Sequence, residues 1–238
     1  MRRPRVLLIQ VRSHPAAKAQ EQLCFLERCG LTADRLDAAN VVEDPEIPWE
    51  RVARADAVFM GGAGAHSVTH EYPFTAPLRD LVLRIVDEGP PFFGSCWGHH
   101  FLAQVLGGKV VTDLERGEVG TFDVELTSRG REDPLFGGLP PRFPAQLGHH
   151  DRVAALPAGV EELALSDRCP FQALRVTGKP VYGTQFHSEM NAEQMRDRML
   201  MYQRAYLDDG MTVEEFDRLV APTPETESLL RRFLELYA

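Results

Sequence analysis

Residues 90–100 read PPFFGSCWGHH, and they predict a buried strand that runs through a tight turn into a helix. Residues 91–93 form an apolar run, and residues 101–106 place apolar side chains with helical spacing. Glycines on both sides of Ser-Cys-Trp let the backbone turn sharply and lift Cys96 clear of the sheet as a nucleophile. The alternative is that Cys96 is a small buried core residue, as unpaired cysteines often are.

Strand-like and helix-like segments alternate along the first half of the chain. The continuous apolar run at residues 6–11 is typical of a parallel strand covered on both faces, and residues 16–28 have helical spacing. A strand candidate at residues 57–60 runs straight into Gly61-Gly62, and residues 78–86 give one apolar helix face. This alternation predicts an α/β fold with a doubly wound sheet and flanking helices.

The predicted secondary structure changes twice in the second half of the chain. Short strand-like pieces separated by turn residues are expected at residues 119–126, 160–165, 171–176 and 181–185. Helical patterns follow at residues 190–206, 213–220 and 225–237. We therefore expect one α/β domain over residues 1–190, with residues 191–238 as a helical extension packed on the same domain.

Composition narrows the class of protein. The chain has 238 residues and a formal net charge of −9, which argues against nucleic acid or an anionic membrane as a partner. No apolar run approaches the roughly 20 residues that span a bilayer. The four cysteines form no C-x-x-C pair, which suits a reducing compartment, and we expect a cytoplasmic protein.

A second group of chemically useful residues lies far from Cys96 in the sequence. In GTQFHSE, residues 183–189, alternate residues of an extended segment face the same way, so Glu189 can orient the imidazole of His187. His187 would then act as the base for Cys96. The backbone N–H groups of Gly61-Gly62 could bind a developing oxyanion. Each of these three segments alone is weak evidence for catalysis. Together they supply a nucleophile, a base and oxyanion donors for acyl transfer, each at a predicted strand end.

Three segments, GGAGAHSV, PFFGSCWGHH and GTQFHSEM, resemble the three signatures of the class I glutamine amidotransferase family, in the same order. LGHHDRVAALPAG, residues 147–159, resembles a stretch of its GMP synthetase branch. The resemblance implies a flavodoxin-like, mostly parallel sheet and a catalytic triad of Cys96, His187 and Glu189. It also implies a γ-glutamyl thioester, release of ammonia from glutamine, and backbone oxyanion donors at Gly62 and Trp97.

Two positions depart from the family pattern. The family usually has a glutamine that helps to hold the substrate where this chain has His100, and a proline where it has Ala63. We expect substrate-binding roles for four residues: Gly61, His100, His149 and His150. The histidines and Cys96 lack compact ligand spacing, so we expect no metal and no cofactor.

The expected function is cysteine-dependent hydrolysis or transfer at the γ-glutamyl amide of glutamine or a glutamine-like compound. We expect no ATP-binding synthetase domain in this sequence. Such a chain either feeds ammonia to a separate synthetase subunit or hydrolyses γ-glutamyl amides outright, as related γ-glutamyl peptidases do. The alternative is a catalytically silent binding or regulatory protein of the same fold, and the complete triad counts against it.

Overall fold

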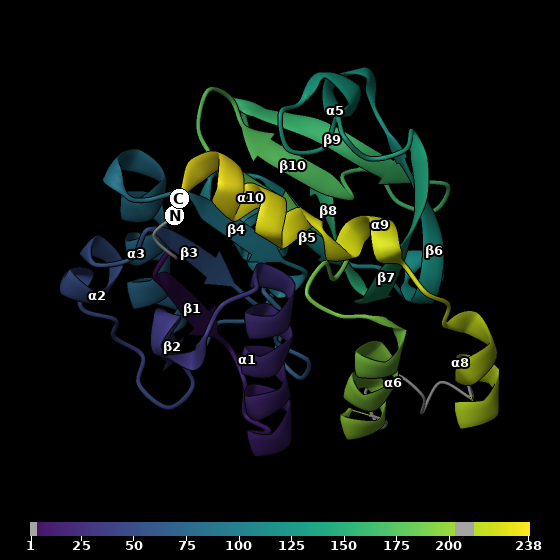
Figure 1. Ribbon diagram of the computed structural model, residues 1–238, viewed down its shortest axis with the longest axis horizontal. Coiled ribbons are helices and arrows are strands. Elements are labelled where there is room, and N and C mark those ends of the chain that lie inside the picture. The colour runs from purple at the N-terminus through teal and green to yellow at the C-terminus, as the bar shows by residue number, and fades with distance from the viewer. Residues whose placement is uncertain (1–3, 203–211) are drawn as a thin grey trace.

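The computed structural model describes residues 4–202 and 212–238 (Figure 1). Nine strands of the described chain form one sheet: β1 (Val6–Gln10), β2 (Leu36–Asn40), β3 (Ala57–Met60), β4 (Phe92–Ser95), β6 (Glu118–Leu126), β7 (Arg142–His149), β9 (Val160–Ser166), β10 (Ala173–Val176) and β11 (Val181–Thr184). β5 (Lys109–Thr112) and β8 (Asp151–Ala155) form a separate two-stranded sheet.

One half of the sheet is parallel, in the order β2-β1-β3-β4-β11. The order 2-1-3-4 with a fifth parallel strand is the flavodoxin-like arrangement. Every residue of β1, β3, β4 and β11 is buried, as expected for apolar strands that are covered on both faces. The predicted α/β flavodoxin-like fold is therefore confirmed.

The other half of the sheet is antiparallel and runs from β11 through β10, β9 and β6 to β7. The four strand-like pieces predicted between residues 119 and 185 form β6, β9, β10 and β11. Strand β7 pairs with β6 from Arg142 opposite Glu125 to His149 opposite Glu118. This register carries His149 and the neighbouring Gly148 to the region of Cys96.

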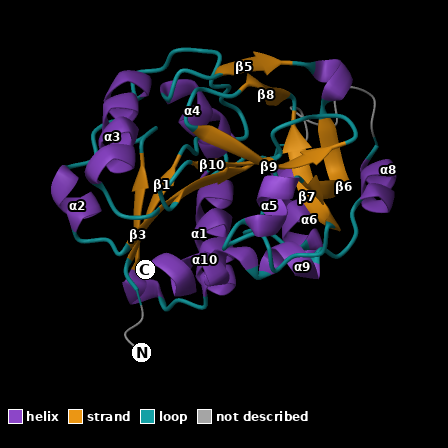
Figure 2. Ribbon diagram, turned by 90° about the horizontal axis from the view of Figure 1, so that it is seen from above, coloured by secondary structure: helices purple, strands orange, loops and turns teal. Residues whose placement is uncertain are grey.

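Helices cover both faces of the sheet, as Figure 2 shows. The side chains of Val6 and Leu8 in β1 point into one apolar cluster, and those of Leu7 and Ile9 point into another. The first cluster includes residues of α1 (Pro15–Cys29) and α10 (Leu229–Tyr237), and the second includes residues of α3 (Thr75–Glu88) and α4 (Trp97–Val105). Alternation along β1 thus sorts the helices between the two faces.

The described residues also form the helices α2 (Trp49–Ala53), α5 (Ser128–Glu132), α6 (Ala192–Met201), α8 (Val213–Leu219) and α9 (Pro224–Glu227), and the 3₁₀ turns Ala33–Arg35 and Leu114–Arg116. The helix predicted over 190–206 corresponds to α6, and residues 203–206 of that prediction lie outside the described residues. Phe233 of α10 packs against Phe59 and Phe93 of the parallel strands. The division at residue 190 stays a prediction. Within the described residues, no helix combines the length and apolar character needed to cross a membrane.

Candidate active site

Cys96 occupies a sharp turn between β4 and α4. Its backbone φ is 50° and its ψ is −100°, in a region that non-glycine residues rarely adopt. The Cys96 N–H donates to the Thr184 carbonyl of β11 at 2.7 Å, and the Gly98 N–H donates to the Gly61 carbonyl at 3.2 Å. These hydrogen bonds tie the turn to its neighbouring strands and hold Cys96 in this conformation.

The glycines on either side of Cys96 allow the close packing of this turn. A Cβ on Gly98 would lie 2.6 Å from the Met60 carbonyl oxygen, and a Cβ on Gly94 would lie 2.6 Å from the Gly98 carbonyl carbon. Neither position has room for a side chain, because the nearest atoms are backbone. The glycines therefore have the structural role that the sequence pattern predicts.

His187 and Glu189 form a buried pair next to this turn. The distance between His187 Nδ1 and Glu189 Oε1 is 2.6 Å, and Ser95 Oγ donates to Glu189 Oε2 at 2.8 Å. Burial lowers the pKa of His187, but the charges of Glu189 and Cys96 outweigh it and raise the pKa overall. Burial raises the pKa of Glu189, and the charge and hydrogen bond of His187 outweigh it and lower the pKa overall.

Gly62 brings Cys96 and His187 together. A Cβ on Gly62 would lie 3.2 Å from His187 Cε1 and 3.8 Å from Cys96 Cβ, so both side chains border this glycine. The three predicted triad residues thus share one site. Its acyl-transfer chemistry would use the sulfur as nucleophile and the imidazole to move protons.

The two predicted oxyanion donors lie at strand and helix ends beside Cys96. Gly62 follows β3, and Trp97 is the first residue of α4. The N–H of a first helical residue has no partner within its own helix, so it is free to bind an anion. The Trp97 indole stacks on Phe101 with ring centroids 4.7 Å apart. The oxyanion role of both residues stays a prediction.

His100 contacts Gln185, a residue for which no role is expected from the sequence. His100 Nε2 lies 2.6 Å from Gln185 Oε1, and the Gln185 amide donates to Cys96 Sγ at 3.8 Å. Burial lowers the pKa of His100 to about 4, against a raising effect of the Gln185 hydrogen bond. The ring is therefore neutral at pH 7, and its Nε2–H donates to Gln185. Gln185 precedes His187 by two residues in the extended segment GTQFH. This spacing in the sequence could have indicated that both side chains face Cys96.

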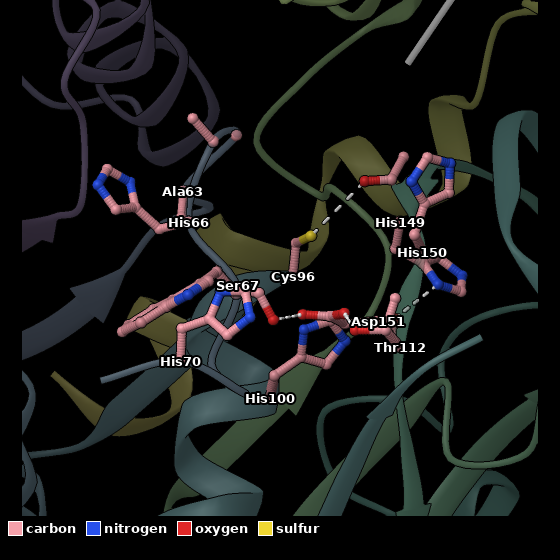
Figure 3. Close-up of a pocket in the computed structure, with 14 residues that line it drawn as sticks. Ala63, His66, Ser67, His70, Cys96, His100, Thr112, His149, His150 and Asp151 are labelled. Atoms are coloured by element: carbon pink, nitrogen blue, oxygen red, sulfur yellow. Dashed lines mark hydrogen bonds between the residues drawn. The ribbon is translucent and has the colours of Figure 1, made fainter. Parts of the chain in front are cut away.

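A cavity of about 260 Å³ opens beside Cys96. Figure 3 shows Cys96 between Ala63 and His66 on one side and His149 and His150 on the other. His100 also lines this cavity, so the structure gathers three of the four predicted substrate-binding residues there. The fourth, Gly61, does not line it; a Cβ on Gly61 would collide with the carboxylate of Glu21.

His149 is held firmly by the protein. Its Nε2 lies 3.0 Å from Glu118 Oε2 and its Nδ1 lies 2.9 Å from the Asp151 carbonyl oxygen. Both ring nitrogens thus have protein partners, which favours contact with a substrate through the ring face. The role of His149 and of His150 in substrate binding stays a prediction.

One group of described residues could hold a metal ion. Ligand atoms of Glu118, His149 and Cys169 all lie within 4.8 Å of one another. The Glu118 carboxylate already accepts hydrogen bonds from Ser166 Oγ at 2.9 Å and from Gln172 Nε2 at 2.6 Å. Together with the His149 contact, these hydrogen bonds form a buried network that joins Glu118 of β6 to β7 and to β9. The absence of a metal stays our prediction.

The family model of glutamine amidotransferase class-I matches residues 34–204. Because this match covers well over half of the 238 residues, the chain belongs to the class I glutamine amidotransferase family. The predicted family is therefore confirmed.

Sequence relatives include GMP synthases. The GMP synthase (glutamine-hydrolyzing) of Vibrio atlanticus is 36% identical over 149 residues, which are 63% of this chain and 26% of that protein. The protein of the same description from Thermosipho melanesiensis is 34% identical over 160 residues, 65% of this chain and 29% of that protein. This chain thus spans less than a third of the length of these relatives.

Solved structures share the fold over nearly the whole chain. A glutamine amidotransferase of Thermotoga maritima has a TM-score of 0.77 at 23% identity, covering 99% of this chain and 98% of that one. A candidate GMP synthase subunit of Thermoplasma acidophilum has a TM-score of 0.70 at 19% identity, covering 99% and 94%. At these identities the likeness supports the fold.

Proposed function

We propose that the chain cleaves the γ-glutamyl amide of glutamine or a glutamine-like compound through a thioester at Cys96. The observation that carries this proposal is that Cys96 and His187 both border Gly62, beside a cavity of about 260 Å³. Glu189 pairs with His187 at the same place. A volume of this size suits a small amino-acid substrate. The glutamyl part would lie in this cavity, with its carbonyl carbon against the sulfur.

The proposed reaction has two halves. Cys96 Sγ attacks the γ-carbonyl carbon, the C–N bond breaks, and His187 gives its proton to the departing ammonia or amine. Glu189, held by Ser95, stabilises the imidazolium and fixes the ring. His187 then takes a proton from water, which cleaves the thioester and releases glutamate. The amides of Gly62 and Trp97 stabilise the oxyanion in both halves.

The test is glutamate formation from glutamine by the wild type and by Cys96→Ser. We expect the substitution to abolish turnover and to leave the thermal unfolding temperature nearly unchanged, because serine fills the same space. Turnover that survives in the folded variant would overturn the assignment of the nucleophile. A wild type that binds γ-glutamyl compounds without cleaving any of them would support the silent binding protein instead.

A second candidate function is the supply of ammonia to a separate synthetase. The likeness to the candidate GMP synthase subunit of Thermoplasma acidophilum favours it. Copurification of a synthetase with this chain from its own cells, together with a rise in glutamine hydrolysis on addition of that partner, would support this role. Full activity without any partner, unchanged by its addition, would argue against it.

A further inference from the structure

A second, smaller cavity of about 20 Å³ also borders Cys96. Cys96, Gly148, Ala63 and Gly64 border both cavities, whereas of the two only the smaller one is lined by His187. In the proposed reaction His187 protonates the departing nitrogen, so the leaving group must face this smaller cavity. The residues that line the smaller cavity therefore determine which leaving groups the site accepts.

Arg198 of α6 lines this cavity as a buried cation. The residue is only 2% exposed, and its Nε donates to Gln20 Oε1 at 2.6 Å. Its two terminal nitrogens, Nη1 and Nη2, make no hydrogen bond within the described residues, although both are buried. A buried guanidinium with two nitrogens that lack hydrogen bonds is costly, so its presence at this place indicates a site for an anionic group.

The carboxylate nearest to Arg198 already has other partners. Glu21 Oε1 accepts from Arg12 Nε at 3.1 Å and from Arg12 Nη2 at 2.6 Å, and Glu21 Oε2 accepts from Gln10 at 2.9 Å. Arg198 Nη1 lies 3.9 Å from Glu21 Oε1, beyond hydrogen-bond distance. Two guanidinium groups thus share the Glu21 carboxylate, and both Arg12 and Arg198 line the smaller cavity.

We propose that Arg198 binds the carboxylate of an amino-acid leaving group, so that the chain cleaves γ-glutamyl amino acids. This inference rests on the proposed function. In such a substrate one carbon atom separates the scissile nitrogen from the carboxylate, so a nitrogen beside His187 places the carboxylate in the cavity that Arg198 lines. As the thioester forms, the C–N bond breaks and the nitrogen takes the His187 proton. The free amino acid then leaves with its carboxylate on the guanidinium.

The size of the cavity limits the leaving group. A volume of about 20 Å³ holds little more than one water-sized group. Met199 lines the same cavity, and its unbranched side chain can move aside for a slightly larger group. Even glycine, the smallest amino acid, requires this movement of Met199, and larger amino acids require more, so we expect glycine as the preferred leaving group.

The test compares γ-glutamylglycine with γ-glutamylglycinamide, which has the same shape but no charge on the leaving group. Glutamate release is the readout for both substrates. We expect the wild type to prefer γ-glutamylglycine in kcat/KM by about tenfold to a hundredfold, the range that a charge-assisted hydrogen bond gives. Arg198→Gln should bring the ratio close to one, and Arg198→Lys should keep part of the preference.

Arg196→Gln is the matched control on the same helix. The Arg196 side chain is 42% exposed and pairs with Asp217 at 2.6 Å, so this variant should keep the wild-type ratio. Equal kcat/KM for the two substrates in the wild type would overturn the inference, and so would a ratio that Arg198→Gln leaves unchanged. If Arg198→Gln does not fold, the wild-type comparison alone decides. Glutamate from glutamine but none from γ-glutamylglycine would overturn this inference alone, whereas no glutamate from any of the three compounds would overturn the proposed function.

Discussion

At the scale of single residues, the buried pair of His187 and Glu189 couples the stability of the fold to pH. The pKa of His187 is raised in the folded chain, so its stabilising effect is complete below about 6.5 and is lost as pH rises through the folded pKa. The pKa of Glu189 is lowered, so its stabilising effect is complete above about 4.3 and is lost as pH falls through the folded pKa. Both effects are complete together between about pH 4.3 and 6.5.

We therefore predict that Glu189→Gln lowers the free energy of unfolding most within this pH window. The loss should become smaller above this window, where the unfolded chain loses the His187 proton, and below it, where the unfolded chain protonates Glu189. Urea unfolding of wild type and variant across the pH range measures this difference. A difference that is constant with pH would contradict the charged pair.

His100 supports a second prediction at this scale. Its Nε2–H holds Gln185, and Gln185 in turn donates to Cys96 Sγ. In His100→Gln the flexible amide replaces a rigid ring, so both the hydrogen bond to Gln185 and the contacts with the substrate change. We expect the kcat/KM for glutamine to change by about tenfold, which is the effect of roughly one hydrogen bond. Steady-state glutamate release measures it, and identical kinetics would show that His100 does not influence the pocket.

At the scale of elements, the turn from β4 into α4 depends on contact with β3. A Cβ on Gly98 would meet the Met60 carbonyl oxygen at 2.6 Å, and backbone atoms cannot move aside cheaply. We predict that Gly98→Ala lowers the free energy of unfolding by about 1–3 kcal/mol, as overpacking does. We also expect a fall in glutamate release that is larger than the loss of folded protein explains, because Cys96 moves with α4. Thermal unfolding and glutamate release test both effects, and a variant as stable as the wild type would contradict the close packing.

The sequence revealed this turn because its signals are local. Glycines at positions 94 and 98 around Cys96, an apolar run before them and helical spacing after them all lie within a short stretch. His187 and Glu189 were predicted for the same reason, since residues two apart in an extended segment share a side.

Other parts of the site depend on contacts between segments that are distant in sequence. Strand β7, which carries His149, was not predicted, because its residues show no clear alternation of apolar and polar side chains. Arg198 has an ordinary helical context, and nothing local shows that it lines a cavity next to Cys96. Ser95 lay inside the quoted motif, yet its hydrogen bond to Glu189 joins residues 94 positions apart. Such roles follow only from tertiary packing.

At the scale of the whole molecule, one apolar cluster connects both halves of the sheet with the C-terminal helix. It contains Phe59 of the parallel half, Phe143 of the antiparallel half and Phe233 of α10, all fully buried. Removal of a buried phenylalanine ring leaves a cavity and costs about 3–5 kcal/mol. We predict that Phe233→Ala lowers the free energy of unfolding by about this amount, measured by denaturant titration.

Leu236→Ala is the control for this prediction, because Leu236 lies on the same helix and is 44% exposed. Its effect should stay within about 0.5 kcal/mol. Similar effects of the two substitutions would contradict the role of α10 in the shared core. A separate early transition of the C-terminal segment in Phe233→Ala would show that it folds independently of the sheet.

The two cavities that meet at Cys96 also have a kinetic consequence. If the acyl group occupies the larger cavity and the amine the smaller one, the amine can dissociate while the enzyme is still acylated. Glutamate, as the last product, should then inhibit competitively with the substrate, whereas the amine should inhibit noncompetitively. An added amine that enters the smaller cavity would compete with water for the thioester. The ratio of transfer to hydrolysis would then depend on whether an amine or water occupies this cavity of about 20 Å³.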